Sequence, residues 1–269
     1  RVLEKLLAEE IAAGTNAVIY GDGKDLIAGA DVDIIDICLP TYLHAEHALA
    51  AMNKVKYLFI EKPVTLTLAE GKAYATTVAE CGDIDLLINN AGIITSNRTF
   101  DQVEISEIDR TMRINAIAPM YVAHVMLPDM LRRGVGHICN ITSAGGMLGN
   151  PRMAVYGASK WAAIGWSESV RIELQEQKSK VRVTTVAPYY INTGMFDGVK
   201  SPIIPILDPE KTAAKILRAI ERDKNFKGIP FGFHFIRFWQ FILPTRLFDF
   251  FFGKVFGIYH TMDNFVGRK

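Results

Sequence analysis

Two hydrophobic patterns alternate along the chain, and together they predict its class of fold. Short apolar runs, typical of buried strands, lie at residues 17–20, 34–40, 57–63, 84–90, 137–143, 181–188 and, more weakly, 227–233. Between several of these runs, apolar residues recur three or four positions apart, as they do on one face of a helix. Strands that alternate with helices favour parallel βαβ units. We therefore predict an α/β fold with a doubly wound parallel sheet of about seven strands in three layers.

The helical segments can be placed from the same pattern. We expect helices at residues 2–13, ending at Gly14, and at 41–52, a segment that opens on a possible N-cap, Thr41. Two further helical patterns run through residues 104–131, with Ser106 as the expected cap. A longer helix is predicted at residues 154–174.

Composition narrows the function classes but does not choose among them. A chain of 269 residues suits one large α/β domain or two small ones, and a net charge of +1 with scattered basic residues gives no sign of a nucleic-acid partner. Cys38, Cys81 and Cys139 form no metal-ligand spacing and no even disulfide set, so we expect a reducing, cytoplasmic setting. We expect Cys38 and Cys139 to be small buried side chains. The start at Arg1 shows no secretory signal, and the missing Met indicates that residues preceded it.

The candidate chemistry centres on Tyr156 and Lys160, which lie four positions apart in the predicted helix. Both side chains therefore leave the same helix face. A tyrosine hydroxyl has a pKa near about 10, and a nearby ammonium favours the phenolate and lowers that pKa. Ser143 lies 13 positions before Tyr156, at the end of an apolar run, where open α/β sheets place their ligands. Such a Tyr–Lys pair alone is common, and other residues must support a catalytic role.

Further motifs supply that support. Asn89-Asn90-Ala91-Gly92 ends an earlier apolar run, and Asn115 lies in the helical pattern that follows. The chain thus carries, in this order, an NNAG turn, a helix Asn, a strand-end Ser and a YxxxK motif. This set closely resembles the short-chain dehydrogenase/reductase family. The resemblance covers about residues 79–269, roughly seven tenths of the chain.

This resemblance implies a Rossmann-like fold, NAD or NADP as cofactor, and interconversion of an alcohol and a carbonyl on a small molecule, in what is expected to be a homo-oligomer. In the family pattern Tyr156 moves the proton, Lys160 lowers its pKa and holds the ribose, Ser143 orients the oxygen, and Asn115 anchors a relay water. The residues that the resemblance assigns to cofactor binding are Asn89, Ala91, Gly92, Tyr156, Lys160, Pro188, Ile191 and Thr193.

One departure from the family pattern bears on the substrate. Pro188 is followed by Tyr189, where the family usually has glycine, so the pocket beside the nicotinamide is expected to be smaller. Subgroups that act on retinoids, steroids and other lipids are similar in this respect. The expected substrate is therefore apolar, with Thr193 bonding the nicotinamide carboxamide.

The first third of the chain follows another pattern. The segment from Asp31 to His44, followed by Glu61-Lys62-Pro63, resembles the nucleotide-binding domain of the glucose-fructose oxidoreductase/inositol dehydrogenase family over about residues 1–78. There His44 and Lys62 would flank the nicotinamide. The plainer alternatives are a polar side chain at a helix end for His44 and an exit turn for Pro63.

The sequence contains no Thr-Gly-x-x-x-Gly-x-Gly turn, whose glycines let backbone amides approach a pyrophosphate. Gly21-Asp22-Gly23 is the nearest candidate, and we interpret it as an ordinary turn. We thus expect a chimera of partial Rossmann segments, 1–78 and 79–269, packed as one α/β domain. Two hypotheses follow: a dehydrogenase, or a non-catalytic protein that has lost its dinucleotide cradle.

The C-terminal region is rich in aromatic residues. Ten phenylalanines and Trp239 lie between Phe231 and Phe256. Polar residues such as Arg237 interrupt this stretch before it reaches about 20 residues, which excludes a transmembrane helix. A substrate lid, a dimer face and an interfacial helix on a membrane all remain open.

Overall fold

The computed structural model describes residues 12–13, 15, 17–39, 43–52, 54–55, 57–60 and 84–267. The chain divides into two compact units, Arg1–Gly82 and Asp83–Lys269. Most of the predicted helix at 2–13, and the candidates Lys62 and Cys81, lie outside the described residues.

The first unit contains a small parallel sheet. Its elements, in chain order, are α2 (Gly23–Gly29), β1 (Ile34–Ile37), α3 (His44–Ala51) and β2 (Tyr57–Ile60). The strands β1 and β2 pair in parallel, as the βαβ pattern predicts. A small core packs around these elements, formed by Ile27, Ile35, Ile37, Ala48 and Ala51.

Two sequence predictions in this unit are wrong. Residues 17–20 do not form a strand, and Val18 is 73% exposed, because this short apolar run is paired with no neighbouring strand of the described chain. Cys38 is exposed rather than buried, because β1 ends at Ile37 and Cys38 follows it.

Gly21-Asp22-Gly23, interpreted from the sequence as an ordinary turn, instead begins the helix α2, with Asp22 as its N-cap. The Asp22 carboxylate accepts a hydrogen bond of 2.7 Å from the backbone N–H of Lys24, in the first turn of α2. An N-terminal amide that could have faced a phosphate is therefore satisfied by a carboxylate from the chain itself.

The second unit is built on a four-stranded parallel sheet in the order β3-β4-β5-β6. The strands are β3 (Leu86–Asn89), β4 (His137–Ile141), β5 (Arg182–Pro188) and β6 (Phe226–Ile229). All of them were predicted, within a few residues at each end. The six described strands of the chain thus lie in one two-stranded and one four-stranded sheet.

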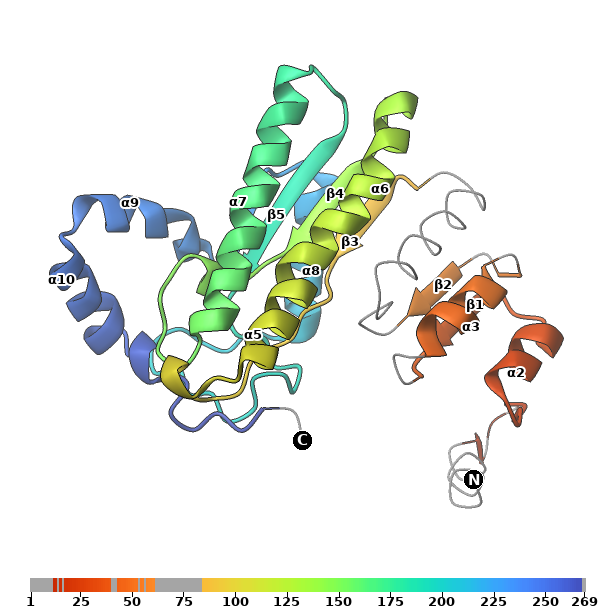
Figure 1. The fold of residues 1–269 in the computed structure, drawn as a ribbon, viewed down its shortest axis with the longest axis horizontal. Coiled ribbons are helices and arrows are strands. Elements are labelled where there is room, and N and C mark those ends of the chain that lie inside the picture. Colours follow the sequence, from red (N-terminus) through yellow and green to blue (C-terminus); the bar gives the residue numbers. More distant parts are fainter. Residues whose placement is uncertain are drawn as a thin grey trace. The chain divides into compact units, whose positions relative to one another are not determined.

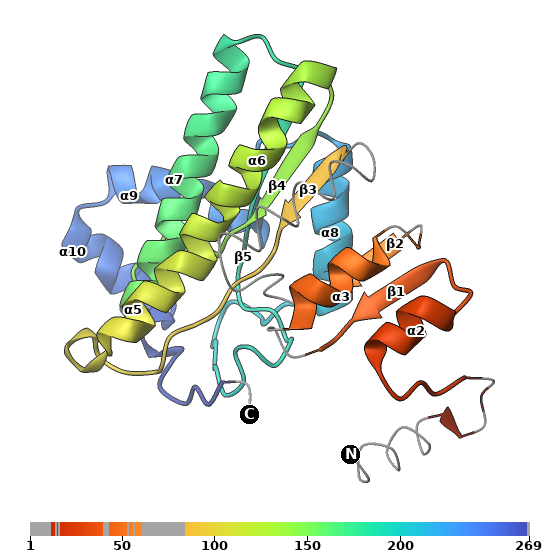
Figure 2. The same cartoon turned by 45° about the vertical axis from the view of Figure 1, so that its right-hand side comes forward.

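Helices cover both faces of this sheet. The helices α6 (Ala118–Arg133) and α7 (Ala154–Glu176) lie side by side on one face, and α8 (Pro209–Glu221) lies on the other (Figures 1 and 2). After β6, the chain continues into α9 (Ile236–Ile242) and α10 (Thr245–Phe248) at the left of Figure 1.

The helix α5 (Ile105–Met112) precedes α6, and its start corrects one prediction. Its N-cap is Glu104 rather than Ser106, because Glu104 and Glu107 form a reciprocal capping box. A π-helical segment, Arg113–Ile117, joins α5 to α6.

A ladder of polar side chains crosses the sheet beneath these helices. Asn89 on β3 donates to Asn140 on β4 at 2.8 Å, and Asn140 donates to Ser167 on α7 at 2.8 Å. Ser167 in turn shares a hydrogen bond of 2.7 Å with Thr185 on β5. Asn140 itself is 2% exposed, and its buried amide is satisfied by these partners from β3 and α7.

Replacing Asn140 by alanine is expected to destabilise the fold by about 1–3 kcal/mol, because it removes the two hydrogen bonds that this buried side chain makes with Asn89 and Ser167. Urea denaturation measures this change in the free energy of unfolding. The control is Asn225→Ala at an exposed position, which should change stability by less than about 0.5 kcal/mol. Equal stability of the two variants would show that the ladder does not support the fold.

Candidate active site

The predicted catalytic pair of Ser143 and Tyr156 is brought together at the carboxyl end of the sheet. Ser143 follows β4 and caps a short 3₁₀ turn, where its Oγ accepts from the N–H of Gly145 at 3.1 Å. Tyr156 lies in the first turn of α7, is 4% exposed and hydrogen-bonds with Ser143 through their side chains. The two hydroxyls therefore meet although they are carried by different elements.

The close approach of the 3₁₀ turn to α7 depends on glycine. A Cβ added to Gly146 would lie 2.7 Å from the backbone carbonyl carbon of Lys160. Any side chain here would push the turn away from the helix and separate Ser143 from Tyr156.

Lys160 is buried one helical turn after Tyr156, at 5% exposure. Its Nζ donates to the carbonyl of Ile141, the last residue of β4, at 3.2 Å and lies 5.9 Å from the centroid of the Tyr156 ring. The expected i and i+4 placement on one helix face is thus present.

The electrostatics of Tyr156 differ from the expectation. Burial raises the pKa of the Tyr156 hydroxyl to about 12, while the hydrogen bond with Ser143 acts in the opposite direction. The net shift is therefore upward, opposite to the lowering that the sequence predicted from Lys160, whose ammonium donates to the backbone carbonyl of Ile141. The phenol therefore holds its proton at neutral pH.

Asn115 clamps the site from the other side. It lies in the π-helical segment and is 1% exposed. Its Nδ2 donates to the carbonyl of Ile93 at 2.8 Å and to Ser159 Oγ at 3.0 Å, and its Oδ1 accepts from the N–H of Ile93 at 2.8 Å. Ser159 also donates to the backbone carbonyl of Tyr156 at 2.7 Å. One amide thus ties the loop after β3 to the helix that carries Tyr156.

Gly92 completes this cluster. A Cβ added at Gly92 would lie 3.3 Å from Lys160 Nζ and 3.4 Å from Asn115 Oδ1. Because Gly92, the last residue of the NNAG turn, has no side chain, space remains beside the Lys160 ammonium. Asn89, from the strand before that turn, instead directs its amide into the polar ladder.

The remaining predicted cofactor residues lie at or beyond the end of β5. Pro188 is its last residue and pairs with Ile229. Ile191 forms an isolated parallel bridge with Leu207, and the N–H of Thr193 donates to the carbonyl of Ile191 at 2.9 Å. Because the strands are parallel, their carboxyl ends and that of β4 share one sheet edge.

A shallow pocket, partly open to solvent, begins at Ser143. Its wall is mostly aromatic and aliphatic, and comprises Ser143, Ala144, Gly145, Leu148, Asn150, Met153, Tyr189, Tyr190, Phe196, Phe233 and Ile258. The residue that replaces the family's glycine, Tyr189, stacks on Phe233 with 5.4 Å between ring centroids.

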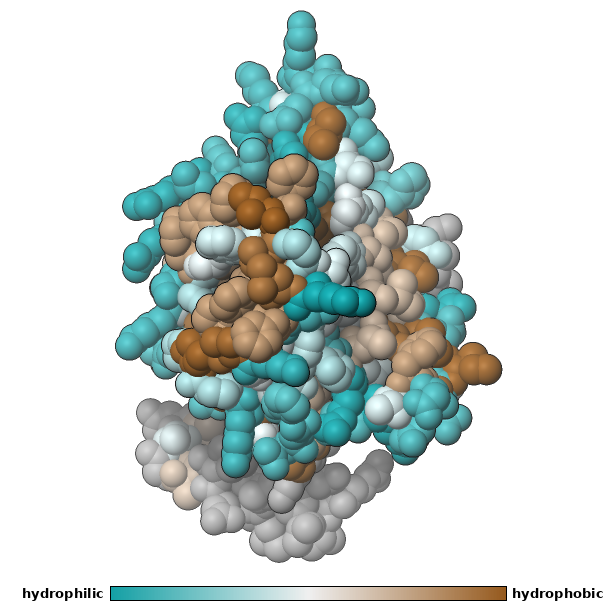
Figure 3. Space-filling view, turned by 90° about the vertical axis from the view of Figure 1, so that its left-hand side faces the viewer, coloured by the Kyte–Doolittle hydropathy of each residue, from teal (hydrophilic) through white to brown (hydrophobic). Residues whose placement is uncertain are grey.

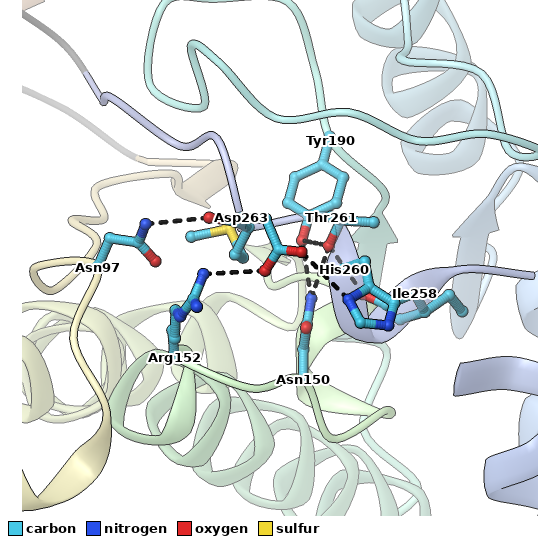
Figure 4. Close-up of polar contacts among 9 residues, drawn as sticks. Asn97, Asn150, Arg152, Tyr190, Ile258, His260, Thr261 and Asp263 are labelled. Atoms are coloured by element: carbon cyan, nitrogen blue, oxygen red, sulfur yellow. Dashed lines mark hydrogen bonds and ion pairs between the residues drawn. The ribbon is translucent and has the colours of Figure 1, made fainter. Parts of the chain in front are cut away.

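A polar cluster that was not predicted from the sequence holds two residues of this wall, Asn150 and Tyr190, in place (Figure 4). Asn150 Nδ2 donates to Tyr190 Oη and to Thr261 Oγ1, both at 3.0 Å, and those two hydroxyls also share a hydrogen bond of 3.0 Å. Arg152 pairs with Asp263 at 2.9 Å in the same cluster. These contacts join residues 40 to 111 positions apart, which no local motif reveals.

Comparisons with known proteins agree with this geometry. Residues 27–203 match the sequence profile of the short chain dehydrogenase family. Human epidermal retinol dehydrogenase 2 is 36% identical over 194 residues, which cover 71% of this chain and 62% of that protein. Human estradiol 17-beta-dehydrogenase 11 is 30% identical over 169 residues, covering 62% of this chain and 56% of that protein.

A solved structure supports the fold. A short-chain dehydrogenase from Streptomyces avermitilis has a TM-score of 0.58 at 23% identity, covering 81% of this chain and 85% of that one. The protein is therefore of the α/β, Rossmann-like class with a parallel sheet, as the sequence predicts. Within this class, the chain belongs to the short-chain dehydrogenase family. It spans about 62% of the length of the retinol dehydrogenase that it matches.

The raised pKa of Tyr156 predicts a loss of stability in alkali. The unfolded chain releases this proton near pH 10, whereas the folded chain keeps it until about pH 12, so stability is full below pH 10 and falls as pH rises between these values. The free energy of unfolding, measured with urea at several pH values, should fall by about 1.4 kcal/mol less per pH unit for Tyr156→Phe than for the parent in this window.

The matched control is Tyr121→Phe, whose ring is exposed. It should keep the parent's pH dependence. A Tyr156→Phe variant with the parent's slope would contradict burial of an un-ionised phenol at this position.

Proposed function

We propose that the protein is an NAD(P)-dependent oxidoreductase that interconverts an alcohol and a carbonyl on a small lipophilic substrate. The observation that carries the proposal is the hydrogen bond between Tyr156 and Ser143 at the edge of an apolar pocket. Membership of the short-chain dehydrogenase family supports it.

Tyr156 and Lys160 fit the ribose next to the nicotinamide ring of a dinucleotide. The absence of a Cβ at Gly92 leaves space beside Lys160, and the ammonium is a suitable donor to ribose hydroxyls. In the proposal Tyr156 and Lys160 hold the ribose, and Thr193 bonds the carboxamide. The bound nicotinamide supplies or accepts the hydride, which protein side chains cannot do.

The phosphate half fits less well. The glycine-rich turn is missing from the sequence, and the Asp22 carboxylate caps the short helix α2. We therefore assign no phosphate-binding residue, and Asn89, Ala91 and Gly92 remain proposed contacts on the adenosine side. The likeness of residues 1–78 to another oxidoreductase family likewise stays a prediction. Within residues 1–78, His44, which that likeness places beside the nicotinamide, is buried at 1% exposure, and its ring is hydrogen-bonded to the backbone carbonyl of Leu39.

The proposed proton chemistry follows from the protonated phenol. In the reductive direction Tyr156 donates its proton to the carbonyl oxygen, while Ser143 holds that oxygen in place. In the oxidative direction the phenol must first lose its proton, through a relay that passes Lys160. The amide of Asn115 has only one Oδ1 lone pair left to anchor a relay water, because Ile93 and Ser159 occupy its other positions.

The pocket favours a lipophilic alcohol or carbonyl over a sugar. Tyr189, Phe196 and Phe233 present large apolar surfaces, with few polar groups to pair with a polyol. The retinol and estradiol dehydrogenases named above support this substrate class. The proposal also includes a cytoplasmic homo-oligomer with peripheral membrane contact.

Tyr156→Phe is expected to lower the rate of carbonyl reduction by about a hundredfold or more, because it removes the proton donor while keeping the ring. Rates are measured with NADH and NADPH on a panel of lipophilic aldehydes and ketones. Tyr121→Phe, at an exposed position, should retain the parent's rate. Equal rates for Tyr156→Phe and the parent would remove this tyrosine from the mechanism.

A second candidate function is that of a non-catalytic partner for a related subunit. The missing glycine turn is the observation that favours it. Titration of NADH or NADPH fluorescence separates the two candidates. Binding below millimolar cofactor supports the oxidoreductase, and no binding at millimolar cofactor supports the non-catalytic protein.

A further inference from the structure

The C-terminal segment presents an unusually large apolar surface, here called the aromatic face. Figure 3 shows it as a group of apolar side chains with polar residues around it. Each of its members is at least 40% exposed, and Phe241 is 90% exposed. The aromatic face consists of Phe231, Phe235, Phe238, Trp239, Phe241, Ile242, Leu247, Phe250, Phe251 and Val255.

The exposure is not explained by weak attachment of this segment to the core. Phe233, Ile236 and Phe248 come from the same segment and are 3%, 4% and 8% exposed, and all three belong to the main hydrophobic core. The segment therefore has one face anchored in the protein and a second apolar face directed outward, a pattern typical of an interaction surface.

The charges on this segment select the partner. Arg237, Arg246 and Lys254 are exposed, and Arg237 pairs with Glu168 of α7. Asp249 is the segment's one acidic residue, and its carboxylate accepts a hydrogen bond from Tyr259. An excess of basic groups beside exposed Phe and Trp is complementary to the anionic headgroups and acyl boundary of a bilayer.

A second copy of this chain fits the same surface less well. A second copy would bring another surface with an excess of basic groups against this one, and like charges brought together oppose association. No helix of the described residues is long and apolar enough to cross a bilayer. Because α9 has 7 residues and Pro244 separates it from α10, the segment suits a position in the plane of the interface.

We propose that the aromatic face docks the protein on an anionic lipid surface and admits lipophilic substrate from that surface. The pocket wall includes Phe233, which lies within the segment 231–255 that carries the aromatic face, and Ile258, three positions beyond that segment. A substrate dissolved in the acyl region therefore lies beside the segment that forms the pocket wall. The admission of substrate rests on the proposed function, whereas docking itself does not.

Sedimentation with vesicles tests docking on the full chain. Vesicles of phosphatidylcholine alone are compared with an equal mixture of phosphatidylcholine and phosphatidylserine, and the mixture should bind more tightly. The double variant Phe238→Ser/Phe241→Ser is expected to require roughly tenfold or more lipid for half-maximal binding, because two large apolar side chains no longer enter the bilayer.

The matched control is Phe100→Ser, a substitution at a 63% exposed phenylalanine away from the segment. It should bind as the parent does. A second variant, Arg246→Gln/Lys254→Gln, should weaken binding to the anionic vesicles and leave binding to phosphatidylcholine unchanged.

Three outcomes would overturn the proposal: absence of parent binding, equal binding of the parent and the Phe238→Ser/Phe241→Ser variant, or a change in oligomeric state of that variant in lipid-free buffer without a change in vesicle binding. The last would identify the face as a contact between copies. Reduction of the lipophilic aldehydes and ketones is measured separately, in buffer without vesicles. Vesicle binding by a protein that reduces none of them would retain docking and reject the oxidoreductase.

Discussion

A single buried amide holds the candidate site together. Asn115 bonds both backbone groups of Ile93 and the hydroxyl of Ser159, so the loop after β3 and the helix α7 keep a fixed separation. The π-helical turn between α5 and α6 carries this amide into the interior. Because Tyr156 and Lys160 lie on the same helix as Ser159, their positions relative to Gly92 follow from this clamp. The polar ladder through Asn140 also joins the helix α7 to the strands β3 and β4.

Burial determines the protonation state of Tyr156. The Tyr156 hydroxyl is almost fully removed from water, and the cost of placing a negative charge there raises its pKa. The site as folded therefore holds a protonated phenol beside Ser143. Reduction of a carbonyl needs that form, whereas oxidation of an alcohol needs the proton to be removed first.

The sequence predicted the features that depend on local spacing. A spacing of four residues, close to the 3.6 of one helical turn, places Tyr156 and Lys160 on one face, and the apolar run before Ser143 marks a strand end. Both features were therefore predictable from the sequence. Long-range effects were not predictable in this way. The sign of the Tyr156 pKa shift depends on burial by distant segments, and the contact of Asn150 with Thr261 spans 111 positions. Residues 17–20 have a strand's composition but pair with no neighbouring strand of the described chain, so pattern alone misassigned them.

In the proposed reaction, a hydride from the cofactor and a proton from Tyr156 reach the same carbonyl group. The most direct test is transfer of deuterium to a lipophilic aldehyde from reduced cofactor that carries deuterium at both C4 positions of the nicotinamide, with the alcohol product analysed by mass spectrometry. The account predicts one deuterium per alcohol formed by the parent protein. An alcohol that forms without deuterium, or no alcohol at any cofactor concentration, would contradict it.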